Sequence, residues 1–319
     1  MSVASRALER LKRIKSQISP FSMTKTKLAI GAGTAYAAYQ YLKNNGYGFK
    51  KDVKNEHVYI TGAGSGLGKI VSKKLAKLGA NITVTDIDLT AAEQTVQEIE
   101  LEGGNAIAIK VDVSNPENIK ESAEIATKRF GNVTILINNA GIVSGKKILD
   151  ISNELVKKTF EVNSLALIYT TKQFLPQMLE MDKGHIVTIA SAAGYIGSPG
   201  LVDYSASKFA AIGIDESLRT ELANIGSKVT TTCVCPYFIN TGMFDGVQTR
   251  FPSILPILKP EWASQRIVDA ILKEESMAIF PWFIGNAHLF KALLPPKMFD
   301  MVSEFFGIND IMKNFKGRH

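Results

Sequence analysis

A glycine-rich turn between a strand pattern and a helix pattern constrains the fold of this chain more than any other feature. Residues 57–60 form an apolar run that predicts a strand, and residues 69–78 carry apolar side chains at helical spacing. Between them, residues 61–68 have the sequence TGAGSGLG. Glycines let a backbone approach a pyrophosphate closely, and the N-terminus of a helix offers unpaired N–H groups to it. The turn therefore predicts a phosphate-binding site within a parallel βα unit.

Strand-like and helix-like segments alternate along the chain after residue 52. Repeated strand–helix units imply right-handed crossovers between parallel strands. The predicted fold class is α/β: a single doubly wound, parallel, seven-stranded Rossmann sheet over residues 53–250, with a substrate-side, membrane-proximal C-terminal extension over residues 251–319. The strands are expected near residues 57–61, 81–86, 105–111, 133–138, 184–190, 229–235 and 277–281.

Asp86, at the end of the second predicted strand, lies 24 residues after Gly62. At that distance from the glycine turn of a dinucleotide-binding unit, a carboxylate can accept hydrogen bonds from ribose hydroxyls. The same negative charge would repel a 2′-phosphate, and Ile87 offers no arginine to hold one. The sequence therefore predicts NAD as the cofactor, with NADP as the alternative.

Tyr204 and Lys208 lie four residues apart in a helix-forming segment, so their side chains share one helix face. A free phenol titrates near ~10 and is a poor base at neutral pH. A neighbouring ammonium stabilises the phenolate and lowers the pKa of the phenol. The pair is therefore a candidate proton donor and acceptor, although Tyr and Lys are common enough to meet by chance. Ser191, at the end of a predicted strand, and Asn163, inside a helix pattern, are further polar candidates.

These motifs together resemble those of the short-chain dehydrogenases/reductases. The matching segments lie between residues 53 and 245: the glycine turn at 61–68, NNAG at 138–141, Ser191, and the pair Tyr204 and Lys208. The resemblance implies an oxidoreductase in which Tyr204 transfers a proton and Ser191 positions the reacting oxygen. It also implies that Asn163 holds a water that connects Lys208 to solvent, which completes the catalytic set.

The same resemblance implies the residues that contact the cofactor. Lys208 would contact its ribose, Thr241 its carboxamide, and Asn138 its adenine side. The full implied set is Gly62, Ser65, Gly66, Leu67, Gly68, Asp86, Asp112, Val113, Asn138, Ala140, Tyr204, Lys208 and Thr241.

Three further segments are similar to membrane-associated retinol dehydrogenases and their hydroxysteroid dehydrogenase relatives. They are residues 235–244 (CPYFINTGMF), 258–261 (LKPE) and 314–318 (NFKGR). Most of the family has glycine where this chain has Tyr237, so this phenol is expected to face the substrate and narrow its pocket. The residues expected to line that lipophilic pocket are Tyr237, Met243, Phe244 and Phe251.

The predicted function is therefore the NAD-dependent interconversion of a lipophilic alcohol, such as retinol or a hydroxysteroid, and its carbonyl compound. One alternative is an NADP-dependent carbonyl reductase that acts on keto-lipids. Another is a non-catalytic lipid-surface protein that keeps the fold as a scaffold. A soluble polyol dehydrogenase would have no use for the basic N-terminal segment or the apolar extension.

The positive charge of the chain is confined to residues 1–52. This segment has ten Lys or Arg and two acidic residues, a net charge of +8, whereas the whole chain carries +7 and the remainder therefore −1. A nearly neutral catalytic domain gives no sign of nucleic-acid binding. The basic segment is instead typical of an arm that associates with membranes.

Two parts of this arm suit a lipid surface. Residues 5–18 place apolar side chains on one helical stripe among basic ones. Residues 28–42 carry no charge but are shorter than the ~20 residues of a usual span. A membrane-embedded hairpin or interfacial anchor is predicted; a true span and a cleaved signal or transit segment are the alternatives. The catalytic domain would then face the cytosol at the endoplasmic reticulum membrane or a lipid droplet, with a mitochondrial location as the alternative.

Cys233 and Cys235 are the only cysteines, and they lie two apart on one predicted strand. They form no disulfide framework, which indicates a reducing compartment for the catalytic domain. No histidine cluster is visible, so no metal site is predicted. By family resemblance, the helices near 153–180 and 204–224 would pair into a homodimer.

Overall fold

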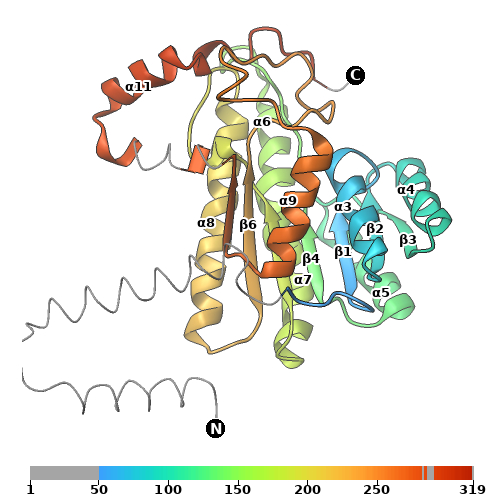
Figure 1. The fold of residues 1–319 in the computed structure, drawn as a ribbon. Coiled ribbons are helices and arrows are strands. Elements are labelled where there is room, and N and C mark those ends of the chain that lie inside the picture. The colour runs from blue at the N-terminus through green and yellow to red at the C-terminus, as the bar shows by residue number, and fades with distance from the viewer. Residues whose placement is uncertain (1–49, 282–283, 286–290, 318–319) are drawn as a thin grey trace, which may run out of the picture. The chain divides into compact units, whose positions relative to one another are not determined.

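The computed structural model describes residues 50–281, 284–285 and 291–317. Within them, seven strands form one sheet in the order β3-β2-β1-β4-β5-β6-β7 (Figure 1). All neighbouring strands run parallel, which confirms the predicted doubly wound sheet. The strands are β1 His57–Thr61, β2 Asn81–Asp86, β3 Asn105–Lys110, β4 Ile135–Asn138, β5 His185–Ile189, β6 Thr230–Pro236 and β7 Met277–Phe280.

Helices connect these strands, and polar caps define several helix starts. Side-chain oxygens of Asp88, Asn115 and Ser152 accept hydrogen bonds from first-turn N–H groups. Such caps satisfy donors that have no partner within the helix. The α-helices are α3 Gly66–Lys77, α4 Leu89–Leu101, α5 Pro116–Phe130, α6 Asn153–Phe160, α7 Ala166–Glu180, α8 Val202–Asn224, α9 Pro260–Lys273 and α11 Pro296–Phe305. The shorter elements are the π-helix η1 Glu161–Leu165 and the 3₁₀-helices η2 Ala192–Gly194 and η3 Ile308–Asp310.

The hydrophobic core lies on both faces of the sheet. In β1, Val58 and Ile60 pack in the cluster that includes side chains of α3, α4 and α9. Tyr59, between them, packs in the cluster on the other face, with side chains of α5 and α7. This alternation follows from the two-residue period of a strand. Both faces are therefore covered, as a parallel sheet requires.

The strand order reverses between β1 and β4. The chain first builds outward from β1 to β3 and then crosses back to begin β4 on the other side of β1. Open parallel sheets bind their ligands at such a switch point, beyond the carboxyl ends of the strands. The fold thus places the glycine turn after β1 and the segment after β4 at one location.

Some sequence predictions concern segments outside the described residues. The two membrane-directed segments of the arm are among these, because they lie within residues 1–49. Among the helices that the structure does describe, none combines the length and apolar character needed to cross a bilayer. Cys233 and Cys235 are both buried and free, with their Sγ atoms 3.8 Å apart.

Candidate active site

Two cavities lie at the carboxyl ends of the strands. The larger one, of about 280 Å³, extends over residues of the glycine turn, Asp86, Lys208 and Thr241. The smaller one, of about 50 Å³, has mostly apolar walls and is called the apolar cavity below. The residues that line both, and so form the wall between them, are Ser191, Tyr204, Tyr237 and Phe244.

The glycine turn borders the larger cavity with bare backbone. Gly62 and Gly66 have φ angles of +62° and +56°, which favour glycine. A Cβ on Gly62 would lie 2.8 Å from the Cα of Ala140, so no side chain fits there. The N-terminus of α3 begins at Gly66 and opens onto this cavity. A backbone cradle at a helix N-terminus is suited to a phosphate group.

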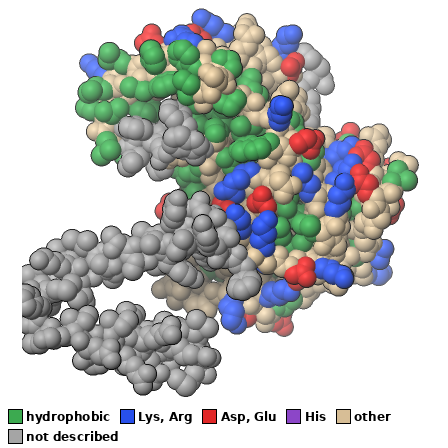
Figure 2. All heavy atoms as spheres, viewed as in Figure 1, with side chains coloured by type: hydrophobic (Ala, Val, Ile, Leu, Met, Phe, Trp, Pro, Cys, Tyr) green, Lys and Arg blue, Asp and Glu red, His purple; other side chains and the backbone are tan. Residues whose placement is uncertain are grey.

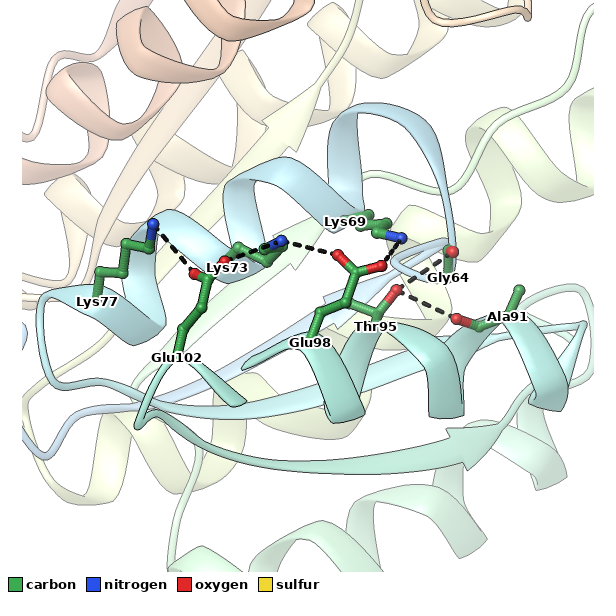
Figure 3. Close-up of polar contacts among 8 residues, drawn as sticks. All are labelled: Gly64, Lys69, Lys73, Lys77, Ala91, Thr95, Glu98 and Glu102. Atoms are coloured by element: carbon green, nitrogen blue, oxygen red, sulfur yellow. Dashed lines mark hydrogen bonds and ion pairs between the residues drawn. The ribbon is translucent and has the colours of Figure 1, made fainter. Parts of the chain in front are cut away.

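The backbone of Gly64 is held from both sides. Its N–H donates to Oδ2 of Asp86 over 2.9 Å. Its carbonyl accepts from Oγ1 of Thr95 over 3.2 Å (Figure 3). A Cβ on Gly64 would lie 2.9 Å from the Cβ of Ala91 on α4. The turn is therefore locked between the end of β2 and the helix that follows it.

Ion pairs between α3 and α4 hold these two helices side by side next to the turn (Figure 3). Glu98 accepts hydrogen bonds from Lys69 and Lys73, and Glu102 pairs with Lys73 and Lys77. Single exposed ion pairs contribute little, but a network with shared partners restricts both helices. This network of ion pairs supports the position of α3, whose N-terminus forms part of the backbone cradle.

Asp86 is fixed by two backbone groups at the edge of the larger cavity. Its Oδ2 accepts from Gly64, and its Oδ1 accepts from the N–H of Asp88 over 3.1 Å. Each carboxylate oxygen has two lone pairs, so capacity remains for further donors. Ile87, 60% exposed, lines the same cavity beside it. This edge can accept hydroxyl groups and presents no cation of its own at position 87.

Tyr204 and Lys208 of α8 are both buried; Tyr204 forms part of the wall between the cavities, and Lys208 lines the larger cavity. The hydroxyl of Tyr204 shares a hydrogen bond with Ser191, and its ring packs edge-to-face on Phe244 at 5.7 Å between centroids. Nζ of Lys208 donates to the carbonyl oxygen of Ile189 over 2.8 Å and lies 5.8 Å from the centroid of the Tyr204 ring. Helix α8 and the end of β5 thus bring the predicted Ser–Tyr–Lys set together.

Burial controls the protonation of this pair. It raises the pKa of Tyr204 to about 12, and the hydrogen bond with Ser191 offsets this only in part. Burial also lowers the pKa of Lys208 to about 8. In the polypeptide alone, Lys208 is not among the groups that lower the pKa of Tyr204, and the predicted lowering by Lys208 together with a bound nicotinamide stays a prediction. Desolvation of the phenolate dominates in the polypeptide alone, while the ammonium is bonded to the carbonyl of Ile189.

Asn163 lies in the π-helix η1 and is completely buried. Its Oδ1 accepts from the N–H of Ile142 over 2.8 Å, and its Nδ2 donates to the carbonyl of Ile142 and to Oγ of Ser207. A Cβ on Gly141 would lie 3.4 Å from this Oδ1 and 3.6 Å from Nζ of Lys208. Asn163 therefore lines neither cavity, but it converges with Lys208 at Gly141.

Most residues predicted to contact the cofactor line the larger cavity. They are Gly62, Ser65, Gly66, Leu67, Asp86, Asp112, Val113, Ala140, Tyr204, Lys208 and Thr241. Gly68 and Asn138 do not. Gly68 is needed for close packing, since its Cβ would lie 2.5 Å from the carbonyl oxygen of Gly62. Asn138 is buried, and its Oδ1 accepts from Oγ1 of Thr170 on α7, because successive strand residues face opposite ways.

Sequence reasoning missed several residues of the larger cavity. Asn139 lines it and donates through Nδ2 to the carbonyls of Thr61 and Gly62. The NNAG motif could have pointed to Asn139, because the side chains of two consecutive residues at the end of a strand point to opposite faces of the sheet. Lys158 of α6 also lines the cavity and pairs with Asp112 over 3.3 Å. No sequence signal connects these two, since the helix that carries Lys158 is distant along the chain.

The residues predicted to contact the substrate are divided by the structure. Tyr237 and Phe244 line both cavities, and Met243 lines the larger one. Phe251 lines neither, because its ring packs against Phe305 and Phe306 at centroid distances of 5.6 and 6.2 Å. No group of three or more His, Cys, Asp or Glu side chains that could hold a metal ion occurs among the described residues.

This chain belongs to the short-chain dehydrogenase/reductase family and is an oxidoreductase. The family profile described as short chain dehydrogenase matches residues 56–250, which contain the whole wall between the two cavities.

Similar proteins identify the branch. Epidermal retinol dehydrogenase 2 of Mus musculus is 42% identical over 271 residues, 84% of this chain and 88% of that protein. Estradiol 17-beta-dehydrogenase 11 of Homo sapiens is 40% identical over 249 residues, 78% of this chain and 82% of that protein. A solved short-chain dehydrogenase/reductase from Burkholderia phymatum, in complex with NAD, matches with a TM-score of 0.69 at 27% identity, over 79% of this chain and 96% of that one. The predicted resemblance to the retinol and hydroxysteroid dehydrogenases is confirmed.

Proposed function

We propose that this protein is an NAD-dependent oxidoreductase that interconverts a lipophilic alcohol and its carbonyl compound. The observation that carries the proposal is the position of Ser191 and Tyr204, which line both the larger cavity and the apolar one. A substrate oxygen at these hydroxyls would have an apolar space on one side and the backbone cradle on the other. The names of similar proteins, a retinol and an estradiol dehydrogenase, support an apolar substrate.

The larger cavity fits a dinucleotide on grounds of its own geometry. The bare backbone at Gly62 and Gly66, both with positive φ angles that favour glycine, can approach a pyrophosphate, and a Cβ on Gly62 would collide with Ala140. Asp86 would accept ribose hydroxyls, and its charge would favour NAD over a cofactor with a 2′-phosphate. Asp112 and Val113 would border the adenine, and Thr241 the carboxamide. When bound, the nicotinamide supplies the hydride acceptor for the alcohol or the hydride donor for the carbonyl compound.

The side chains of this chain manage the proton that accompanies each hydride. With a pKa raised to about 12, Tyr204 is protonated at neutral pH and is suited to donate a proton to a carbonyl oxygen. In the oxidative direction it must accept the hydroxyl proton of the substrate, so its phenolate needs stabilisation. Ser191 provides part of this through its hydrogen bond and holds the substrate oxygen in place.

Lys208, in the larger cavity, and Asn163, outside both cavities, would support Tyr204. Lys208 keeps a positive charge near the phenol below about pH 8 and can reach a ribose that lies in the larger cavity. Asn163 fixes the backbone at Ile142 and the hydroxyl of Ser207. We further propose, from family resemblance, that a water at Asn163 connects Lys208 to solvent.

We also propose that the arm of residues 1–52 attaches the enzyme to the endoplasmic reticulum membrane or to lipid droplets. The support is its sequence: the basic amphipathic segment 5–18 and the uncharged segment 28–42. A homodimer through the helical segment 153–180, which contains α6 and α7, and through α8 is proposed from family resemblance.

The proposed function is tested by turnover of purified full-length protein with retinol, a hydroxysteroid, a long-chain alcohol and a polyol, each with NAD and NADP. Tyr204→Phe should lower turnover by roughly 10²–10⁴-fold while NAD still binds, because only the acid–base group is lost. Tyr59→Phe is the matched control, since Tyr59 is a buried phenol on β1 outside both cavities. Undiminished activity in Tyr204→Phe would refute the assignment, and faster turnover with NADP would favour a carbonyl reductase.

A further inference from the structure

Helix α11 carries an apolar stripe that faces away from the protein core. Met298, Met301, Val302 and Phe305 recur at intervals of three and four residues, so they lie on one face of the helix. Their side chains are 53, 69, 40 and 63% exposed, and α11 contains no buried residue. Figure 2 shows hydrophobic side chains gathered over this helix. An exposed apolar stripe of this kind indicates a surface that contacts something other than water.

The stripe belongs to a helix whose C-terminal end is firmly attached. Nη1 of Arg250 donates to the carbonyl oxygens of Glu304 and Phe305 over 2.9 and 3.1 Å, and its Nη2 pairs with Asp310. Phe251 supports the same end by its ring contact with Phe305. The guanidinium thus caps the last carbonyls of α11. The apolar side chains are held in place on the protein surface by these contacts.

Charge around the stripe suits a lipid surface. Lys297 is exposed in the first turn of the helix, near Leu293, which is 71% exposed. Lys291, before the helix, instead donates through Nζ to the carbonyl oxygen of Tyr195 over 2.8 Å. By helical spacing, Asp300 lies on the side of α11 away from the stripe, whereas Glu304 follows Lys297 by seven residues and shares its flank of the helix. Lysines beside an apolar face can reach lipid headgroups while the apolar side chains enter the acyl boundary.

The size of the stripe also argues for lipid and against a protein partner. A stable protein interface uses about 20–30 residues on each side, far more than one helix face offers. An amphipathic helix, by contrast, needs only its apolar face to insert into the outer part of a bilayer.

The segment that follows α11 in the chain forms part of the wall of the apolar cavity. Ile308 and Ile311, which follow α11 directly, line that cavity together with Ile284. The stripe and the cavity wall are therefore consecutive segments of one chain. A lipophilic substrate dissolved in a bilayer would meet this wall next to the inserted helix.

We propose that α11 inserts its apolar stripe into the headgroup boundary of a lipid bilayer and that the substrate reaches the apolar cavity from this membrane face. The insertion stands independently of the reaction, whereas the substrate route rests on the proposed function. The two parts are therefore tested by separate measurements.

Insertion is tested on full-length protein with an environment-sensitive fluorophore at Met301→Cys, and at Leu101→Cys as the matched control. Leu101 is an 81% exposed apolar residue at the end of α4, outside α11. The buried Cys233 and Cys235 should remain unlabelled, which the unsubstituted protein checks. With vesicles of phosphatidylcholine and phosphatidylserine, we expect a blue shift at position 301 and quenching by spin-labelled lipids, but neither at position 101.

Two outcomes would overturn the insertion. The first is an unchanged signal at position 301 while the protein sediments with the vesicles, which would mean attachment without α11. The second is a blue shift at position 301 that grows with protein concentration in the absence of lipid, because a second copy of the chain would then cover the stripe.

The substrate route is tested with Met298→Glu/Met301→Glu against Leu101→Glu. We expect the first variant to raise the apparent KM for an alcohol supplied in vesicles by several-fold and to leave turnover of a short, water-soluble alcohol unchanged. Equal loss on both substrates would contradict a membrane route. Inactivity of the unsubstituted enzyme on every alcohol would refute the proposed function and leave the fluorescence result standing.

Discussion

The backbone N–H of Gly64 donates a 2.9 Å hydrogen bond to Oδ2 of Asp86, which joins the glycine turn to the carboxylate at the end of β2. Asp86 thereby fixes the turn that would approach the pyrophosphate. In the proposed dinucleotide site, the remaining lone pairs of Asp86 would also accept from the ribose hydroxyls. Any substitution of Asp86 must be designed to separate these two roles.

Asp86→Asn removes the charge but keeps an oxygen that can accept from Gly64. We expect nearly unchanged stability, roughly 10- to 100-fold weaker NAD binding, which corresponds to about 1–3 kcal/mol, and improved NADP binding. Ile87→Arg added to this variant should increase NADP binding further. Asp88→Asn is the matched control, because Asp88 is a nearby carboxylate that caps α4. Calorimetric titration with both cofactors measures the ratio, and an unchanged ratio would contradict the role of Asp86.

We expect the buried ammonium of Lys208 to lower the stability of the fold, although the proposed reaction needs this residue. Its pKa is lowered to about 8, below the ~10.4 of an unfolded lysine, so the penalty is fully present below about pH 8 and disappears toward pH ~10.4. Lys208→Met loses the bond to the Ile189 carbonyl but should still gain about 1–3 kcal/mol at neutral pH, with turnover abolished. Urea unfolding at several pH values tests this. A pH-independent loss of stability in the variant would show that burial of the ammonium does not destabilise the fold.

Asn163→Ala should affect both stability and turnover, because it removes three hydrogen bonds to Ile142 and Ser207. At about 1 ± 0.5 kcal/mol each, the expected loss is about 2–4 kcal/mol. Ser164→Ala is the matched control: it is the next residue, also buried, and its Oγ donates only to the carbonyl of Ser207. Kinetics below the unfolding temperature separate the effects. If turnover falls equally in both variants, Asn163 has no role beyond packing.

The sequence allowed the sheet, the glycine turn and the Tyr204–Lys208 pair to be predicted, because each depends on local spacing. Periodicity places strands, and four-residue spacing places two side chains on one helix face. The missed features depend on long-range packing. Phe251 is apolar and close to the substrate motif in sequence, but its position is decided by α11. The protonation of Tyr204 is likewise decided by burial, which no local pattern reveals.

Asp215 of α8 should make the stability of the folded protein depend on pH. Its side chain is 2% exposed, Oγ1 of Thr231 donates to its Oδ2 over 3.3 Å, and its Oδ1 has no hydrogen-bond partner among the described residues. Burial raises the pKa of Asp215 to about 7, well above the ~3.9 of an unfolded aspartate. Between these values the folded protein binds one more proton than the unfolded chain, so its stability falls as the pH rises.

Asp215→Asn should remove this dependence. We expect the variant to match the parent near pH 4 and to exceed it by on the order of 3–4 kcal/mol near pH 8, because the parent must bury a carboxylate there. Glu216→Gln, one residue further and exposed, controls for the loss of one negative charge. Urea unfolding of the three proteins across this pH range measures the differences. A stability difference between Asp215→Asn and the parent that does not change with pH would show that Asp215 titrates as in the unfolded chain.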